Sequence, residues 1–308
     1  MAKVQFDNKT GEWFCVAPNG KRYSSKRESY ITWRASQIDG SGETVQASKE
    51  SFEEDMTSNK YDVNLRFQFI TNFVTMVADK SQPSVIIAGP GGLGKSVTVI
   101  KALKAAGLTD VSNTESFNAG ERLPHKRFRA VKGHSTAKAL YRTLYENKDS
   151  ILLFDDCDSV LRDETASNLL KAVCDSCDER IVSWNAESIF GDDLPRSFRF
   201  TGGIIFITNM DKRKLSQALR TRSIVIDVSM TTEEKMIRMT KIAYEQDFMP
   251  EADQNIKKLA LDVLYKYKYK DNVKDLSLRS LIQVVRIAQT YEKHPDFESM
   301  VDYVLTNE

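Results

Sequence analysis

The sequence predicts an α/β protein with three parts: a core on a mainly parallel five-stranded sheet, a C-terminal all-α lid and a small N-terminal α+β module. Five short apolar runs alternate with helix-length segments in the middle of the chain, strand-like runs stop after residue 229, and a hairpin signal stands near the N-terminus. Such alternation is typical of parallel sheets, because parallel strands need long crossover connections. We expect the parts to span 1–60, 61–229 and 230–308.

The N-terminal part is expected to hold a β-hairpin and a helix, followed by a linker. Asn19-Gly20 favours the positive φ angles of a two-residue hairpin turn and stands between aromatic and apolar residues. An amphipathic stretch with Tyr30 and Trp33 follows. Residues 1–35 carry seven basic and three acidic side chains, whereas 36–60 carry two and six. We expect 1–35 to bind a partner, either protein or nucleic acid, and 36–60 to be a mobile linker.

The core strands are predicted from short apolar runs, since a parallel strand is buried on both faces of its sheet. They are Val85–Ala88, Phe128–Val131, Ile151–Phe154, Ile204–Ile207 and Ile224–Val228. The segments between them are long enough for crossover helices.

The C-terminal part is predicted to be helical throughout. Thr231-x-x-Glu234 is a capping box that opens a helix reaching about Glu245. Helical periods follow near 255–268, 276–291 and 296–305.

Composition excludes several classes of protein. The chain has 44 Lys and Arg against 43 Asp and Glu, which argues against a polycation but leaves local basic patches open. No apolar run approaches the roughly 18 residues of a membrane span, and Met1–Asp7 lacks a signal core. We therefore expect no membrane partner and a cytoplasmic protein. Cys174-x-x-Cys177 has no second pair at zinc-finger spacing, so two half-buried thiols in a helix are expected.

A glycine-rich loop predicts a phosphate site. The sequence from Gly89 to Ser96 matches G-x-x-x-x-G-K-S/T and stands between an apolar run and a helical pattern. Glycines let backbone N–H groups turn toward phosphate oxygens, and the helix start adds positive charge. Lys95 is expected to reach the β- and γ-phosphates, and Ser96 to coordinate Mg²⁺. The nucleotide-binding residues expected here are Gly89, Pro90, Gly91, Gly92, Leu93, Gly94, Lys95, Ser96 and Val97.

An acidic pair follows the third apolar run. Asp155 would end that strand at the sheet edge and hold the hydrated Mg²⁺, with Ser96 as the second metal ligand. Asp156 would orient and deprotonate the attacking water. For Asp158 two readings stay open, a cap for the next helix or an influence on the site.

Together with the glycine loop, four further segments make the chain from about Tyr61 onward resemble the AAA+ ATPases. Asp155–Asp158 looks like the family's acidic motif, and the run ending in Thr208-Asn209 looks like its sensor-1 strand. Residues 218–222 resemble the arginine-finger segment, and 276–280 resemble sensor 2.

The resemblance implies ATP and Mg²⁺ as ligands and assigns roles to four polar side chains. Asn209 would touch the γ-phosphate or the lytic water, and Arg279 would act from the lid in cis. Arg222 is the first choice for a finger donated to a neighbouring subunit, and Arg220 the second. Donation in trans implies a homo-oligomer, a ring or open helix such as a hexamer, with ATP at the interfaces. Each arginine has a plainer reading as a solvated surface side chain.

One residue departs from the family pattern. The usual catalytic Glu is replaced by Asp156, which is one methylene shorter. ATP hydrolysis is then expected to use a slightly moved water or to be slow, as in a timed switch.

The substrate of the ATPase stays open between two classes. Two observations favour DNA. Residues 101–148 carry ten basic against four acidic residues and include the basic loop 132–135. Two expected hairpin strands, near 180–185 and 196–200, carry aromatic residues and arginines that could contact bases and phosphates, although the aromatic residues would equally pack the hairpin onto the domain. The first hypothesis is an AAA+ ATPase that remodels or loads onto nucleic acid in replication or recombination. The alternative is a protein-remodelling AAA+ chaperone recruited through the N-terminal module. A P-loop kinase or monomeric switch leaves Arg222 and the lid unexplained. The layout also resembles phage-encoded ATPases, which work in the host-cell cytoplasm.

Overall fold

The computed structural model describes residues 4–7, 12–16, 22–25, 60–113, 124–133, 135–177, 179–184, 194–270 and 272–306. The chain forms two compact units, Met1–Met56 and Thr57–Glu308. Each unit is described separately below.

The first unit contains a small antiparallel sheet with the strand order β1-β2-β3. The strands are β1 (Gln5–Asp7), β2 (Glu12–Val16) and β3 (Arg22–Ser25). Strands β2 and β3 pair as the predicted hairpin. Because Val16 pairs with Arg22, residues 17–21 connect the two strands, and these residues, Asn19-Gly20 included, lie outside the described ones. The expected helix around Tyr30 and Trp33 and the acidic linker also lie outside them.

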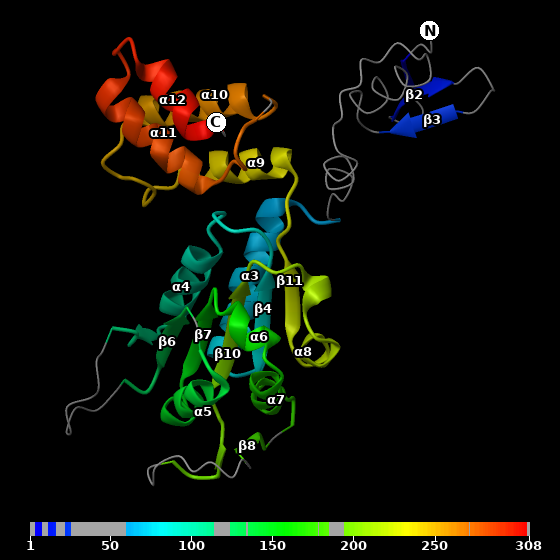
Figure 1. Ribbon diagram of the computed structural model, residues 1–308, viewed down its shortest axis with the longest axis vertical. Helices are drawn as coiled ribbons and strands as arrows, with labels where there is room; N and C mark the ends of the chain where they lie inside the picture. The colour runs from blue at the N-terminus through cyan, green and yellow to red at the C-terminus, as the bar shows by residue number, and fades with distance from the viewer. Residues whose placement is uncertain are drawn as a thin grey trace. The chain divides into compact units, whose positions relative to one another are not determined.

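The second unit is built on a six-stranded sheet, parallel in every pairing, with the order β11-β4-β10-β7-β6-β5 (Figure 1). Its strands are β4 (Ser84–Ala88), β5 (Thr109–Asp110), β6 (Arg127–Lys132), β7 (Ile151–Asp155), β10 (Gly203–Thr208) and β11 (Ile224–Asp227). Five of them are the predicted strands. The predicted number of five is wrong by one, because the edge strand β5 has two residues and leaves no apolar run in the sequence.

Helices cover both faces of this sheet (Figure 1). One face packs against α3 (Val63–Ala78) and α4 (Lys95–Ala105). The other packs against α5 (Ala137–Glu146), α6 (Asp158–Arg162), α7 (Glu164–Val173) and α8 (Gln217–Arg222). Along β4, Val85 and Ile87 enter the first core whereas Ile86 enters the second. Burial on both faces explains why these strands are continuously apolar in the sequence.

The lid consists of four helices around a core of their own, in which Met236, Leu264 and Val284 are fully buried. They are α9 (Thr232–Ala243), α10 (Gln254–Tyr267), α11 (Leu278–Tyr291) and α12 (Phe297–Leu305). The predicted capping box is present, with Thr231 and Glu234 bonded reciprocally at the start of α9.

A buried arginine joins the lid to helix α3. Arg66, which is 2% exposed, donates to the Ser229 carbonyl and, at 2.6 Å, to the Glu234 carboxylate. Nearby, the Arg238 guanidinium of α9 lies 3.9 Å over the ring of Phe67 on α3. Because breaking a buried ion pair is costly, these contacts hold the start of α9 against α3.

The structure places both cysteines of the Cys174-x-x-Cys177 pair and shows the length and character of the helices. Cys174 is buried where α7 ends, but Cys177 is exposed beyond that helix, so the expectation of two similar half-buried helix thiols is wrong. Among the described residues, no helix combines the length and the apolar character needed to cross a membrane.

Candidate functional site

The glycine-rich loop connects β4 to α4 at the carboxyl edge of the sheet. Gly89, Gly92 and Gly94 have φ angles of 145°, 75° and 88°, a region that residues with a Cβ seldom adopt. At Gly89 a Cβ would also lie 2.9 Å from the Val228 side chain. The glycines therefore shape a tight turn that directs backbone N–H groups and the start of α4 toward one point.

Lys95, the first residue of α4, is folded back onto this loop. Its ammonium donates to the carbonyl oxygens of Gly89 at 2.5 Å and Pro90 at 2.7 Å, and to Asn209 Oδ1 at 3.0 Å. The residue is only 5% exposed. Burial lowers the pKa of Lys95 to about 8, although Asp156 and Asp155 oppose this shift. An anion bound beside this buried ammonium would therefore stabilise its charged form.

The two expected metal ligands contact each other. The Ser96 hydroxyl donates to Asp155 Oδ1 at 2.8 Å, and Asp155 is buried at the end of β7. Its other oxygen, Oδ2, lies 3.5 Å from the Lys132 ammonium at the end of β6. A hydroxyl and a carboxylate are the oxygen donors that Mg²⁺ prefers, so this pair fits that ion.

Strand β10 lies between β4 and β7 in the sheet, and its end bridges the loop and the acidic pair. Asn209 accepts from Lys95 and donates through Nδ2 to Asp156 Oδ1 at 2.8 Å. Thr208, fully buried, donates to Asp158 Oδ1 at 2.6 Å. Asp158 is the first residue of α6, but the N-cap of that helix is Cys157 and no side chain caps it, so the helix-cap reading of Asp158 is wrong. Its bond to Thr208, the neighbour of Asn209, supports the other reading, an influence on the site.

A cavity of about 170 Å³ lies at this edge. It brings together nine of the expected site residues: Gly91, Gly92, Gly94, Lys95, Ser96, Val97, Asp156, Asn209 and Arg279. The expected metal ligand Asp155 is not among its lining residues. We call it the phosphate cavity. The lid reaches it directly, because the Leu278 N–H at the start of α11 donates to the Gly92 carbonyl at 2.8 Å. Leu93 is buried beneath the loop.

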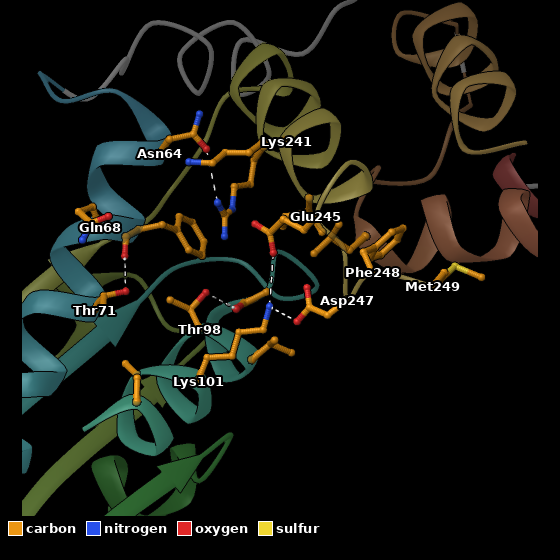
Figure 2. Close-up of a pocket in the computed structure, with 18 of the residues that line it drawn as sticks. Asn64, Gln68, Thr71, Thr98, Lys101, Lys241, Glu245, Asp247, Phe248 and Met249 are labelled. Atoms are coloured by element: carbon orange, nitrogen blue, oxygen red, sulfur yellow. Dashed lines mark hydrogen bonds and ion pairs between the residues drawn. The ribbon is translucent and has the colours of Figure 1, made fainter. Parts of the chain in front are cut away.

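A larger cavity of about 580 Å³, shown in Figure 2, shares Gly94 and Val97 with the lining of the phosphate cavity according to the residues around each. Asn64, Phe67 and Gln68 of α3 line it, together with residues of α4 and the lid. Lys101 of α4 bonds there to Glu245 and Asp247 of the lid (Figure 2). We call it the nucleoside-sized cavity. No sequence motif predicted that α3 residues line this cavity, because their only recognisable pattern is helical periodicity.

The two arginines expected to form a finger lie elsewhere. Both stand in the last turn of α8, and neither lines the phosphate cavity or the nucleoside-sized cavity. Arg220 is exposed. Arg222 is half-buried; it donates to the Ala218 carbonyl at 3.1 Å and lies 3.5 Å from Asp175. The structure thus separates these residues from the phosphate cavity of their own chain.

The hairpin near residues 180–200 forms, and its described aromatic residues, Trp184, Phe198 and Phe200, pack against the core of the domain. Strands β8 (Ile181–Ser183) and β9 (Ser197–Arg199) pair antiparallel. Phe198 and Trp184 contact the ring of Tyr141 on α5 at 5.2 and 5.7 Å between centroids. Stacking of these residues on nucleic-acid bases is therefore the wrong reading; they hold the hairpin to the domain. Residues 185–193 between the strands lie outside the described ones.

Residues 257–270 of the lid are rich in lysine and tyrosine, and their side chains divide between interior and surface. Lys257 is buried and donates to the Phe248 carbonyl at 2.6 Å, and Lys268 pairs with Glu233 at 2.7 Å. Tyr267 is buried where α10 ends, whereas Tyr265 and Tyr269 are exposed. Neither of these two lysines forms part of a simple basic face.

Fold and site define an α/β protein whose parallel sheet carries a glycine-rich loop, a buried lysine and an acidic strand end at one edge. The chain is 31% identical over 263 residues to the uncharacterized 36.7 kDa protein of the nrdC-mobD intergenic region of Enterobacteria phage T4. The match covers 78% of this chain and 75% of the phage protein. The chain belongs to the same family as that phage protein. No protein-family profile matches the chain.

Proposed function

We propose that the chain is an AAA+ ATPase that binds ATP with Mg²⁺, hydrolyses ATP slowly, and acts as a homo-oligomer on nucleic acid. The observation that carries the proposal is the convergence of Lys95, Ser96, Asp155, Asp156 and Asn209 at one sheet edge. These residues come from three neighbouring strand ends. Phosphoryl transfer needs positioned charges of this kind more than it needs covalent chemistry.

Lys95 binds the phosphates. Its ammonium now contacts two loop carbonyls, and burial holds its pKa at about 8. Phosphate oxygens offer the same donors a full negative charge, and charge-assisted hydrogen bonds are about twice as strong as neutral ones. The loop N–H groups and the start of α4 complete an anion site.

Ser96 and Asp155 hold the magnesium ion. A bound Mg²⁺ would supply positive charge that offsets the charge of the phosphates. The Ser96 hydroxyl and the Asp155 carboxylate, 2.8 Å apart, are the two oxygen groups of this chain that would hold it.

Asp156 and Asn209 orient the attacking water. The amide of Asn209 spans from Lys95 to Asp156, so it ties the phosphate end of the site to the base. Asp156 is exposed to the phosphate cavity and accepts the proton of the water. Its short side chain is the reason that we propose slow turnover.

The nucleoside of ATP occupies the nucleoside-sized cavity between α3, α4 and the lid. Its volume of about 580 Å³ lies within the range of small-molecule sites. Because the lid forms one wall and Arg279 reaches the phosphate cavity from it, nucleotide binding would fix the lid on the core.

Arg222 acts in trans on the ATP of a neighbouring subunit. It lies outside the phosphate cavity of its own chain, and its contact with the half-exposed Asp175 is the weak kind that another partner can replace. A residue supplied by a neighbour requires a homo-oligomer with ATP at its interfaces, such as a hexameric ring.

Nucleic acid is the substrate favoured by the surface of the β6–α5 region. Lys138 and Arg142 are exposed four residues apart on α5, hence on one helix face. Lys132 and Lys148 are exposed near that helix in the sequence. Lysine and arginine side chains bind phosphates without reading bases. Because the relative is a phage protein, we place this activity in the cytoplasm of an infected cell.

The test measures ATP turnover and oligomer size together, on the full chain, with single-stranded DNA, duplex DNA or no DNA. We expect Mg²⁺-dependent turnover that DNA stimulates and that salt suppresses steeply. The Lys95→Met variant is the negative control. Absence of ATP binding in the wild type overturns the proposal. If the ATP turnover rate does not change with DNA but increases with a protein partner, the protein-remodelling alternative is favoured, with recruitment through the N-terminal module.

A further inference from the structure

Lys132 occupies an unusual place next to the expected metal ligand. It is the last residue of β6 and stands opposite Asp155 in the register of the sheet. Its ammonium lies 3.5 Å from Asp155 Oδ2, while the Ser96 hydroxyl bonds Oδ1. Both oxygens of the carboxylate are therefore occupied by groups of the chain itself.

The two partners of this ion pair differ greatly in exposure. The Asp155 side chain is 6% exposed, and the Lys132 side chain is 67% exposed. A buried carboxylate needs a counter-charge, whereas an exposed ammonium loses little when it returns to water. The pair therefore stabilises Asp155 and can open at low cost from the Lys132 side.

The backbone after Lys132 gives the side chain room to leave. Gly133 has a φ of 86°, and a Cβ built there would meet no atom within 4 Å. Helix α5 starts only after Thr136, whose side chain caps it by accepting from the Ala139 N–H. Movement at Gly133 thus disturbs neither the strand nor the helix.

A divalent cation bound to Asp155 would lie close to the Lys132 ammonium, and the two positive charges would repel each other. We propose that Lys132 is an internal counter-ion that occupies Asp155 until Mg²⁺ arrives and is then expelled, so that the start of the β6–α5 loop responds to metal loading. This inference rests on the proposed ATP and Mg²⁺ site, and it adds a regulatory role for a residue outside the glycine loop.

The test titrates Mg²⁺ against binding of the slowly hydrolysed analogue ATPγS by the full chain, followed by calorimetry. Lys132→Met keeps the length of the side chain and removes its charge. We expect it to lower the Mg²⁺ concentration for half-maximal binding about two- to five-fold, the range of exposed ion-pair energies. Lys132→Arg should keep the wild-type value. Lys126→Met removes an equal charge at the far end of β6 and should also leave the midpoint unchanged.

A second readout follows the loop rather than the affinity. Hydrogen exchange of the backbone amides in 131–137 should increase when Mg²⁺ is added to the wild type with ATPγS. In Lys132→Met these amides should exchange fast from the start and change little.

The outcomes separate the two proposals. If the wild type fails to bind ATPγS at saturating Mg²⁺, the ATPase proposal fails and this inference falls with it. If it binds but Lys132→Met has the wild-type midpoint or a higher one, or if Lys126→Met shows the same decrease, only the counter-ion role of Lys132 is overturned. If hydrogen exchange of the amides in 131–137 of the wild type does not change when Mg²⁺ is added, the proposed response of the loop to the metal is overturned.

Discussion

The phosphate cavity and the end of α8 both carry arginines with expected roles, and they are built in opposite ways. In the phosphate cavity, Arg279 lies with Lys95, Asn209 and Asp156, and Asn209 bonds to both Lys95 and Asp156. At the end of α8, Arg220 is exposed and Arg222 contacts Asp175 of its own chain. The first region gathers its polar residues within one chain, and the second lies outside that cavity.

The difference indicates which functions one chain can perform alone. In the proposed function, binding of ATP needs only the phosphate cavity and the nucleoside-sized cavity, so it should be independent of protein concentration. ATP hydrolysis, if it needs Arg222, should require assembly. Variants in the two regions should therefore differ in how their effects depend on concentration.

The largest effect is expected from Arg222→Ala. Since an arginine finger contributes about 10³–10⁵-fold to turnover, we expect a loss of roughly 1,000-fold in the assembled protein with ATP affinity unchanged. Arg220→Ala is the matched control and should keep most activity. Mixing Arg222→Ala with Asp156→Asn subunits should restore some turnover, measured as phosphate release, because some interfaces then join an intact Arg222 to an intact Asp156. No recovery on mixing would place Arg222 outside the reaction.

Lys95→Met should lower ATP affinity by roughly 100-fold or more, since hydrogen bonds to charged groups contribute about 1.5–3 kcal/mol each. The loss should be the same in dilute and concentrated protein, unlike that of Arg222→Ala. Calorimetry measures the affinity, and Lys104→Met, exposed on the same helix, is the control. Thermal unfolding should show no loss of stability, because the variant removes a buried charge. Unchanged affinity would contradict a phosphate role for Lys95.

Asp156→Asn should lower turnover by about 100-fold, the lower range of general base catalysis, and leave ATP affinity nearly unchanged. Asparagine keeps the hydrogen-bonding shape but does not accept a proton at neutral pH. Single-turnover phosphate release checks the chemical step. Turnover equal to that of the wild type would show that another group is the base.

The smallest effect is expected far from both regions, at Tyr267 in the lid. Its hydroxyl donates to Asp302 at 2.8 Å, and burial raises its pKa from 10 to about 12. A raised pKa means that the protonated phenol adds stability below pH 10, and this is lost as the pH rises through 12. Tyr267→Phe should cost about 1 kcal/mol at pH 7 and show a smaller decline between pH 10 and 12. Urea unfolding at both ends of that window measures this, and ATP turnover should stay unchanged.

The sequence predicted those elements whose signal is local. Continuous apolar runs located the five longer strands, and the capping box at Thr231 located the start of α9. Strand β5 was missed because two residues leave no pattern, and the exposure of Cys177 was missed because α7 ends before it. Trp184 and Phe198 pack on Tyr141, which lies 43 and 57 residues earlier in the sequence, so no local pattern predicts their burial.

The candidate site divides in the same way. The glycine loop and the acidic strand end are contiguous motifs, and parallel strands bring their carboxyl ends to one edge by geometry alone. The bond between Asn209 and Asp156 requires that β10 lie between β4 and β7, and strand order is not written in any one strand. The walls of the nucleoside-sized cavity combine α3 with the lid, so they exist only after packing.

Asp156 has a backbone conformation that restricts which side chains can stand at its position. Its φ of 57° lies in the left-handed region, which aspartate and asparagine tolerate several-fold more often than other residues with a Cβ. A glutamate at this position would extend the carboxylate by one methylene but would lose this local tolerance. If Asp156 is the base, as we propose, its left-handed backbone and its short side chain belong together, because the conformation that directs the carboxylate favours aspartate over glutamate.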